Sequence, residues 1–143
     1  MVRIVVAILM IGLIASQPAL AEIGRVKRSA GTAVVQRGAP KLPASPGLQL
    51  EKGDMLVTGK DGRMALTFID NTRFAVGPNS RVSVNEYLFD RRTQRGQFVT
   101  QVDRGSLAVV SGQIAKSGRD TMKVRTPTSL LGVRGTRFVV EVP

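Results

Sequence analysis

Apolar and polar residues alternate with a period of two over most of this chain. In the stretch RMALTFID, Met64, Leu66 and Phe68 share one face, and the residues between them share the other. The same alternation recurs in TRFAVG, RVSVNEYLF, TMKVRT and TRFVVEV. This pattern is typical of a strand with one face on the core and one face in water. No window carries a sustained helical stripe, so the sequence predicts strands throughout.

Turn signals separate these stretches at short intervals. Asp61-Gly62 and Asp70-Asn71 favour the positive φ of a tight hairpin turn, and GPNS and KSGR are further turns. The proline-rich segment GAPKLPASPG (38–47) is predicted to be a loop without a strand. The sequence therefore predicts one all-β domain of short antiparallel strands in stacked hairpins, arranged as a sandwich, a roll or a short solenoid.

Short segments from the two halves of the chain resemble each other. KDGRMALTF is similar to KSGRDTMKV, and TRFAV is similar to TRFVV. These similarities are consistent with stacked, similar β units.

Composition narrows the chemistry that the chain can perform. The 143 residues include 21 Lys and Arg against 10 Asp and Glu, a formal charge of +11, and no His or Cys. Without His the chain lacks the side chain best suited to proton transfer near neutral pH and the commonest metal ligand. Without Cys it has no thiol nucleophile, disulfide or thiolate metal site. We therefore expect a non-catalytic protein without a cofactor or bound metal.

The N-terminal segment resembles an export signal. Arg3 precedes an apolar run, Ile4–Ile14, and Pro18 and Ala19-Leu20-Ala21 follow it. This order is typical of a secretory signal peptide cleaved after Ala21. The alternative is a retained anchor, but Ser16, Gln17 and Pro18 interrupt the run before the roughly 20 apolar residues that span a bilayer. We expect a signal peptide at 1–21, a β domain at 22–143, and a periplasmic or secreted location.

The densest charge cluster is RRTQR, which contains Arg91, Arg92 and Arg95. We expect it on a loop between the strands around Val84 and Phe98. One interpretation is a solvated loop that keeps the protein soluble. The other is attraction to a polyanion, such as anionic lipid, lipopolysaccharide or an acidic envelope polymer. Nucleic acid is not the expected partner, because only Tyr87 and Phe89 lie near the arginines and their orientation is open.

The segment GVRGT near the C-terminus places Arg134 between two glycines. It matches neither a Walker loop nor a dinucleotide-binding loop. Pro127 favours an extended Thr126 and removes a ladder N–H, which suits an edge or bulge. Gly132 and Gly135 then allow positive φ or close backbone approach. We expect Arg134 at this corner, with hydrogen bonds to turn carbonyls; the alternative is that it contacts a ligand.

The carboxylates do not form a recognisable catalytic or cation-binding pattern. Asp54 has no partner carboxylate at a useful spacing, and no calcium-binding loop occurs. Its side chain is predicted to bond backbone amides of its own turn, as are those of Asp61, Asp70 and Asn79. The serines Ser80, Ser106 and Ser111 have no histidine to activate them.

Taken in order, these motifs resemble the FecR domain family. GDMLVTGKDGRMALTFIDNTRFAVGPNSRVSV, RGSLAVVSGQI and VRTPTSLLGVRGTRFVVEV follow the family pattern from about Ile23 to Val142. The family-motif positions, which we expect to be structural, are Gly53, Asp54, Gly62, Asp70, Asn79, Ser80, Thr126, Pro127, Gly132, Gly135 and Thr136.

The resemblance implies an extracytoplasmic all-β binding module. Its best-known members carry a signal from an outer-membrane iron-siderophore receptor to a cytoplasmic sigma factor. Here no cytoplasmic segment precedes the export signal, so we expect a stand-alone exported protein without that role. The expected function is a non-catalytic binding, scaffold or sensor module of the cell envelope. Its expected partner is an envelope or surface protein or an anionic polymer, and the oligomeric state is open.

Overall fold

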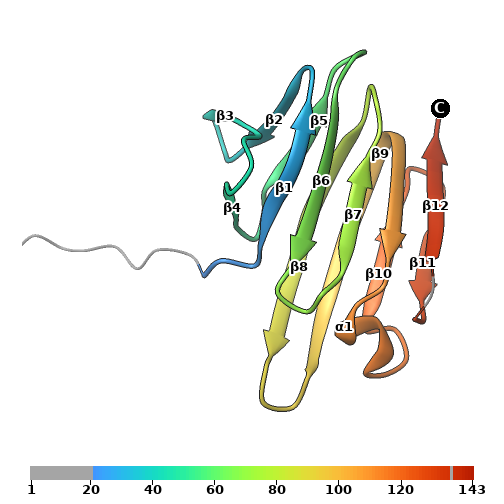
Figure 1. The fold of residues 1–143 in the computed structure, drawn as a ribbon. Coiled ribbons are helices and arrows are strands. Elements are labelled where there is room, and N and C mark those ends of the chain that lie inside the picture. Colours follow the sequence, from blue (N-terminus) through green and yellow to red (C-terminus); the bar gives the residue numbers. More distant parts are fainter. Residues whose placement is uncertain (1–20, 136) are drawn as a thin grey trace, which may run out of the picture.

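The computed structural model describes residues 21–135 and 137–143. This part of the chain forms an all-β domain (Figure 1), as predicted. Thr136 and most of the predicted signal peptide lie outside the described residues. The elements are β1 (Gly24–Ala30), β2 (Ala33–Gln36), β3 (Lys41–Pro43), β4 (Gln49–Leu50), β5 (Met55–Thr58), β6 (Arg63–Phe68), β7 (Arg73–Val76), β8 (Arg81–Asp90), β9 (Arg95–Val110), α1 (Gln113–Lys116), β10 (Met122–Arg125), β11 (Leu130–Val133) and β12 (Arg137–Val142). Within the described residues, no helix is long and apolar enough to cross a membrane.

The long strand β9 belongs to both layers of the domain. Its first half pairs with β8 and, in parallel, with β10, whereas its second half pairs with β7 and β12. We call β4, β1, β6, β7, the end of β9 and β12 layer A, and β3, β2, β5, β8, the start of β9, β10 and β11 layer B. In Figure 1, layer A lies in front of β8 and β10. Gly105, with φ of 89°, marks the change of layer.

The core lies between the two layers and is built by the inward residue of each alternating pair. Met64, Leu66 and Phe68 of β6 are all buried, as the alternation predicted. Inward positions of β7, β8 and β10 are buried in the same way: Phe74, Val76, Val82, Val84, Met122 and Val124. In β12, Val140 is buried, and Phe138 and Val142 pack partly buried against the core.

Four aromatic rings meet at the centre of this core. Phe68, Phe74, Tyr87 and Phe98 have ring centroids 4.8–5.6 Å apart. Three of the contacts are edge-on, an arrangement that aromatic quadrupoles favour. Most of the few aromatic residues of the chain are therefore used to fill the interior.

Residues 41–43 correct the predicted loop, because they form the strand β3. β3 pairs with β2, and Pro43 lies opposite Val34 at the edge of layer B. An edge strand tolerates proline because no further strand needs its missing N–H. The other residues of 38–47 are irregular, as expected.

The turns predicted at Asp61-Gly62, Asp70-Asn71 and GPNS form, whereas KSGR begins with the last residue of the helix α1. Gly62 differs from the prediction in its backbone conformation. Asn71 and Asn79 have φ of 70° and 50°. Gly62 closes its turn by donating to the carbonyl of Gly59 at 3.0 Å, yet its φ is not positive. A Cβ on Gly62 would lie 1.9 Å from the carbonyl oxygen of Thr32. Gly62 is therefore needed for close backbone approach.

The similar segments TRFAV and TRFVV flank β9 on its two sides. Arg73 and Arg137 both lie opposite Val110, and Phe74 and Phe138 both lie opposite Val109. The sequence similarity thus corresponds to two strands that pair with β9 in the same register.

Candidate functional site

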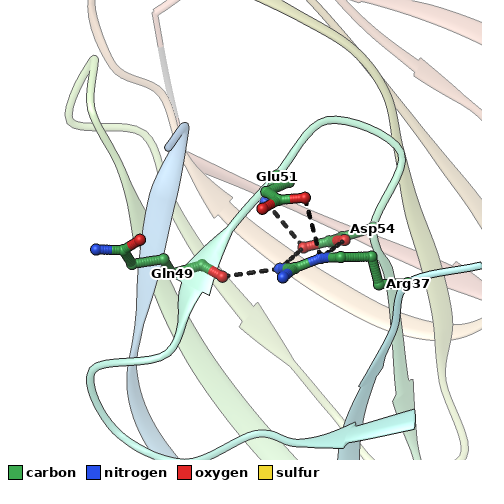
Figure 2. A network of polar contacts seen from close by, with 4 residues as sticks. All are labelled: Arg37, Gln49, Glu51 and Asp54. Atoms are coloured by element: carbon green, nitrogen blue, oxygen red, sulfur yellow. Dashed lines mark hydrogen bonds and ion pairs between the residues drawn. The ribbon is translucent and has the colours of Figure 1, made fainter. Parts of the chain in front are cut away.

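The motif residue Asp54 is the centre of a polar network (Figure 2). Its side chain is 1% exposed, and Oδ2 accepts the backbone N–H of Glu51 at 2.8 Å, the turn contact that was predicted. Arg37 donates from Nε to Oδ1 at 2.9 Å and from Nη2 to Oδ2 at 2.8 Å. Nη2 also donates to the carbonyl of Gln49 at 2.9 Å. The network joins the end of β2 to the segment between β4 and β5.

The electrostatics of this network are those of a structural ion pair. The hydrogen bond to Asp54 raises the pKa of the Arg37 guanidinium, and the charge of Glu51 adds to the shift. Both carboxylate oxygens of Asp54 accept hydrogen bonds within the protein and the side chain is almost fully buried, which fits a structural role. Sequence inspection missed Arg37 because it lies 17 residues before Asp54.

Asp70 forms a second buried network. One oxygen accepts from the Tyr87 hydroxyl at 2.9 Å and from the Thr72 N–H at 3.2 Å, and the other accepts from the Thr72 hydroxyl at 2.7 Å and from the Ile114 N–H at 3.2 Å. Burial raises the pKa of the Tyr87 phenol, and the charge of Asp70 adds to this effect. The network ties the β6–β7 turn to β8 and α1. It confirms the predicted turn contact with the Thr72 N–H and adds three donors that the sequence did not show: the Thr72 hydroxyl, the Tyr87 hydroxyl and the Ile114 N–H.

Ser80 stabilises the point at which β9 passes from one layer to the other. Its N–H donates to Thr58 Oγ1 at 3.0 Å, and its Oγ accepts the N–H of Ser106 at 2.9 Å. Asp61 accepts the N–H of Thr32 at 3.2 Å, a contact outside its own turn. Asn79 makes no side-chain hydrogen bond within the described residues, so the predicted contact with turn amides is wrong. Its turn depends instead on a positive φ of 50°, and Gly53 has a positive φ of 90°.

The GVRGT corner differs in part from the prediction. Gly135 has φ of 40°, whereas Gly132 lies within β11 and its φ is not positive. Arg134 is exposed and makes no hydrogen bond with any described residue, so the expected bonds to turn carbonyls are not formed there. Thr126 and Pro127 begin the hairpin turn between β10 and β11, where the Thr126 N–H donates to the Ser129 carbonyl at 2.9 Å. Pro127 thus occupies a turn and not the predicted edge or bulge.

The arginine cluster lies where it was expected. Arg91 and Arg92 are exposed in the turn between β8 and β9, and Arg95 begins β9. Asp90 shapes the turn by accepting the N–H of Arg92 at 2.9 Å. Tyr87 is buried, so it offers no stacking platform. Arg134 does not join this cluster but borders a separate hollow with Arg119 and Asp120.

The outer face of layer A carries a basic surface that sequence inspection did not find. Ala65, Ala75 and Ala108 lie side by side on β6, β7 and β9, and Val139 of β12 continues their row. Arg73 and Arg137 flank this row on one side, Arg63 flanks it on the other, and Arg28 lies at its end. We call these eight residues the layer A trough. Two adjoining hollows of about 690 and 570 Å³ lie over it.

A short pattern in the sequence could have revealed the trough. Arg63, Arg73 and Arg137 each begin an Arg-apolar-small triplet, namely RMA, RFA and RFV. In a strand, the first and third residues of such a triplet point to the same face. Each triplet therefore places a cation beside a small residue on the outer face. Only the pairing of the strands shows that the triplets are neighbours.

Comparison with known proteins identifies the family. Residues 54–142 match the sequence model of the family described as FecR protein. The chain belongs to the FecR family. Membership suggests a sensor or regulatory module. Neither the curated proteins nor the solved structures include a significant match to the chain.

The matched part of the FecR domain begins at Asp54 and ends in β12. Arg37 precedes the match, so its ion pair with Asp54 fastens the first strands onto the matched region. The FecR motif residues Asp54, Asp70 and Ser80 are thus explained by contacts inside the protein. Within the described residues, no cluster of three acidic side chains is placed to hold a metal ion. The layer A trough and the β8–β9 turn are two exposed surfaces that a partner could contact.

Proposed function

We propose that this FecR-domain protein is an exported, non-catalytic sensor or binding module that contacts an acidic partner protein of the cell envelope through the layer A trough. The observation that carries the proposal is the trough itself, a row of small apolar residues on the outer face of the sheet that is bordered by four arginines and, at its β12 end, by Glu141. A solvated sheet face normally alternates core-facing apolar residues with polar outward ones. Ala65, Ala75, Ala108 and Val139 depart from that rule at adjacent positions.

The chemistry of the trough favours a protein partner. Its arginines provide planar donors for carboxylates. Its floor provides apolar contact area, which a partner with acidic and apolar side chains uses and a purely ionic polymer does not. The buried carboxylates support the non-catalytic part of the proposal, because both oxygens of Asp54 and of Asp70 already accept hydrogen bonds inside the protein.

The arginine turn supports a second candidate function, binding of an anionic envelope polymer. Arg91 and Arg92 are exposed in the β8–β9 turn, Arg95 is exposed at the start of β9, and none of the three belongs to the layer A trough. Binding driven by such charges should weaken steeply with salt. Changing the three arginines to Ser should lower the salt concentration that elutes the protein from heparin. Unchanged elution would remove the turn from the polyanion-binding surface.

Site-specific photo-crosslinking in cells tests the trough. A crosslinker at Ala75, in the trough, should give a discrete adduct that disappears when Arg73 is changed to Glu. The matched position is Asn85, which is exposed on β8 in layer B. The same adducts from both positions, or none from Ala75, would contradict the proposal.

Two further measurements test the remaining parts. N-terminal sequencing of protein from fractionated cells should find a chain that begins at Glu22 in the periplasm or medium. A hydrolysis screen on glycan and peptide substrates should show no turnover. Turnover abolished by one Asp or Ser substitution would contradict the non-catalytic assignment.

A further inference from the structure

β12 is an edge strand that carries exposed apolar side chains. It pairs with β9 on one side and with no other described strand (Figure 1). Of the four large hydrophobic residues that are exposed in the described part of the chain, Leu130, Leu131 and Val139 lie on the edge strands β11 and β12. Val139 is 63% exposed. An open edge with exposed aliphatic residues is a template for strand addition.

The outward residues of β12 are complementary to themselves. Along the strand, Arg137, Val139 and Glu141 point to the outer face of layer A, with the valine midway between opposite charges. If a second β12 pairs antiparallel around Val139, each Arg137 lies opposite the second copy's Glu141. Opposite charges at such positions stabilise a pair of strands, and like charges destabilise it.

We propose that two copies of this protein associate through antiparallel pairing of their β12 strands, with a twofold axis at Val139. The contact is isologous, because the same patch serves both copies. It joins the two A layers into one continuous sheet. Ladder hydrogen bonds form along the edge, and two Arg137–Glu141 pairs border a contact between the two Val139 side chains.

The inner side of the edge fits the same arrangement. A hollow of about 590 Å³ lies between the two edge strands and is bordered by Leu131, Val140 and Val142. In the Val139-centred register, Phe138 lies opposite the second copy's Val140, so the apolar core continues across the contact. Leu131, which is 43% exposed, borders the same hollow.

Charge selects this register over its neighbours. Antiparallel pairing that keeps inward residues inward can be centred on residue 138, 139 or 140, and only a centre at Val139 places Arg137 opposite Glu141. The overall charge of +11 opposes association of two copies. Salt of about 150 mM, with a Debye length of about 8 Å, screens most of that repulsion.

The proposed β12–β12 contact is small, so we expect the two copies to associate weakly. Stable protein interfaces bury about 1,200–2,000 Å² in total. One pair of short strands with Leu131 at its margin provides less than this. We therefore expect an equilibrium between monomer and dimer that shifts with protein concentration, and not an obligate dimer.

Association would also enlarge the layer A trough. Val139 ends the row of small residues in each copy, so the two rows meet at the axis. This consequence does not depend on the proposed function, and the dimer can be tested without a partner.

A charge exchange tests the proposal by sedimentation. Residues 22–143 contain every strand of the described part of the chain and would be measured from about 5 to 500 µM in about 150 mM salt. Arg137→Glu or Glu141→Arg alone should weaken the dimer at least about tenfold, because each creates two like-charge pairs. The double variant should return to within about threefold of wild type. Arg92→Glu is the matched control, since it changes the net charge equally at the β8–β9 turn.

A single introduced cysteine gives a second readout. The chain contains no cysteine, and opposing residues of antiparallel strands lie within the Cα distances that a disulfide spans. Val139→Cys should form a disulfide-linked dimer on mild oxidation, whereas Leu88→Cys, at the 69% exposed residue of β8, should do so far more slowly. A wild-type protein that stays monomeric at about 500 µM, a double variant that fails to recover, or equal crosslinking of both cysteines would overturn the proposal.

Discussion

Removing Arg37 should destabilise the domain because it leaves Asp54 buried without its counter-ion. The Asp54 side chain is 1% exposed, and Arg37 supplies both of its charged hydrogen bonds. After Arg37→Ala, one backbone N–H, that of Glu51, remains on the carboxylate among the described contacts. Breaking a fully buried pair in this way costs about 3–5 kcal/mol. The Arg37 side chain is 31% exposed, so we expect about 2–4 kcal/mol here.

Thermal unfolding followed by circular dichroism measures this loss. For a domain of this size each kcal/mol moves the midpoint by about 4 °C, so Arg37→Ala should melt about 8–16 °C below wild type. Arg37→Lys should fall between the two, because an ammonium cannot reproduce the two parallel bonds of the guanidinium. Arg37→Ala combined with Asp54→Leu should recover part of the loss, since no charge is then left buried.

A matched arginine provides the control. Arg25 forms an ion pair with Glu22, but these side chains are 50% and 30% exposed. Exposed pairs contribute little because water screens them, so Arg25→Ala should melt close to wild type. An Arg37→Ala protein that also melts within about 2 °C of wild type would refute the role assigned to the network.

Further predictions follow from backbone geometry, charge and exposure. Gly105→Ala should lower the free energy of unfolding in urea by about 2–4 kcal/mol, because φ is 89° and the new Cβ would lie 2.1 Å from Ser80 Oγ. Gly38 has φ of 64° but open space around it, so Gly38→Ala should lower the free energy of unfolding less than Gly105→Ala does. Equal losses of stability in the two variants would contradict the steric argument. Gly135→Val should destabilise more than Gly132→Val in the same assay, since Gly135 has the positive φ. Arg134→Ala should melt like wild type. A clearly lower melting temperature would indicate that this side chain has a structural role after all. The pKa of Asp61 is held below the usual value of an aspartate side chain, chiefly by the hydrogen bond from the Thr32 backbone. The stabilisation of the fold by ionised Asp61 is present above that usual value and is lost as pH falls through the folded pKa. The difference in free energy of unfolding between wild type and Asp61→Asn should therefore shrink in acid. A difference that stays constant with pH would contradict this role of Asp61.

Features that depend on neighbours in the chain could be predicted from the sequence. The alternation around Met64 and Leu66 predicted the buried face because successive residues of a strand point to opposite sides. The sequence predicts a positive φ at Asp70-Asn71 and a turn at GPNS, which contains Asn79, because short polar residues and glycine suit turn positions. The turn contact of Asp54 was predictable for the same local reason.

Features that depend on pairing between distant segments could not be predicted. Arg37 reaches Asp54 because β2 and the segment before β5 are folded together, and no local pattern marks that contact. β3 was missed because the prolines of residues 38–47 disfavour a strand in general, whereas an edge position accepts one.

The sequence by itself determined the all-β class, the residues that face the core and the positions of most turns. It did so because strand periodicity and turn conformation are set by adjacent residues. The tertiary structure alone decided that Arg73 and Arg137 flank one row of small residues and that β12 remains an open edge. Both depend on strand order and register, which follow from the joint packing of all strands around the core.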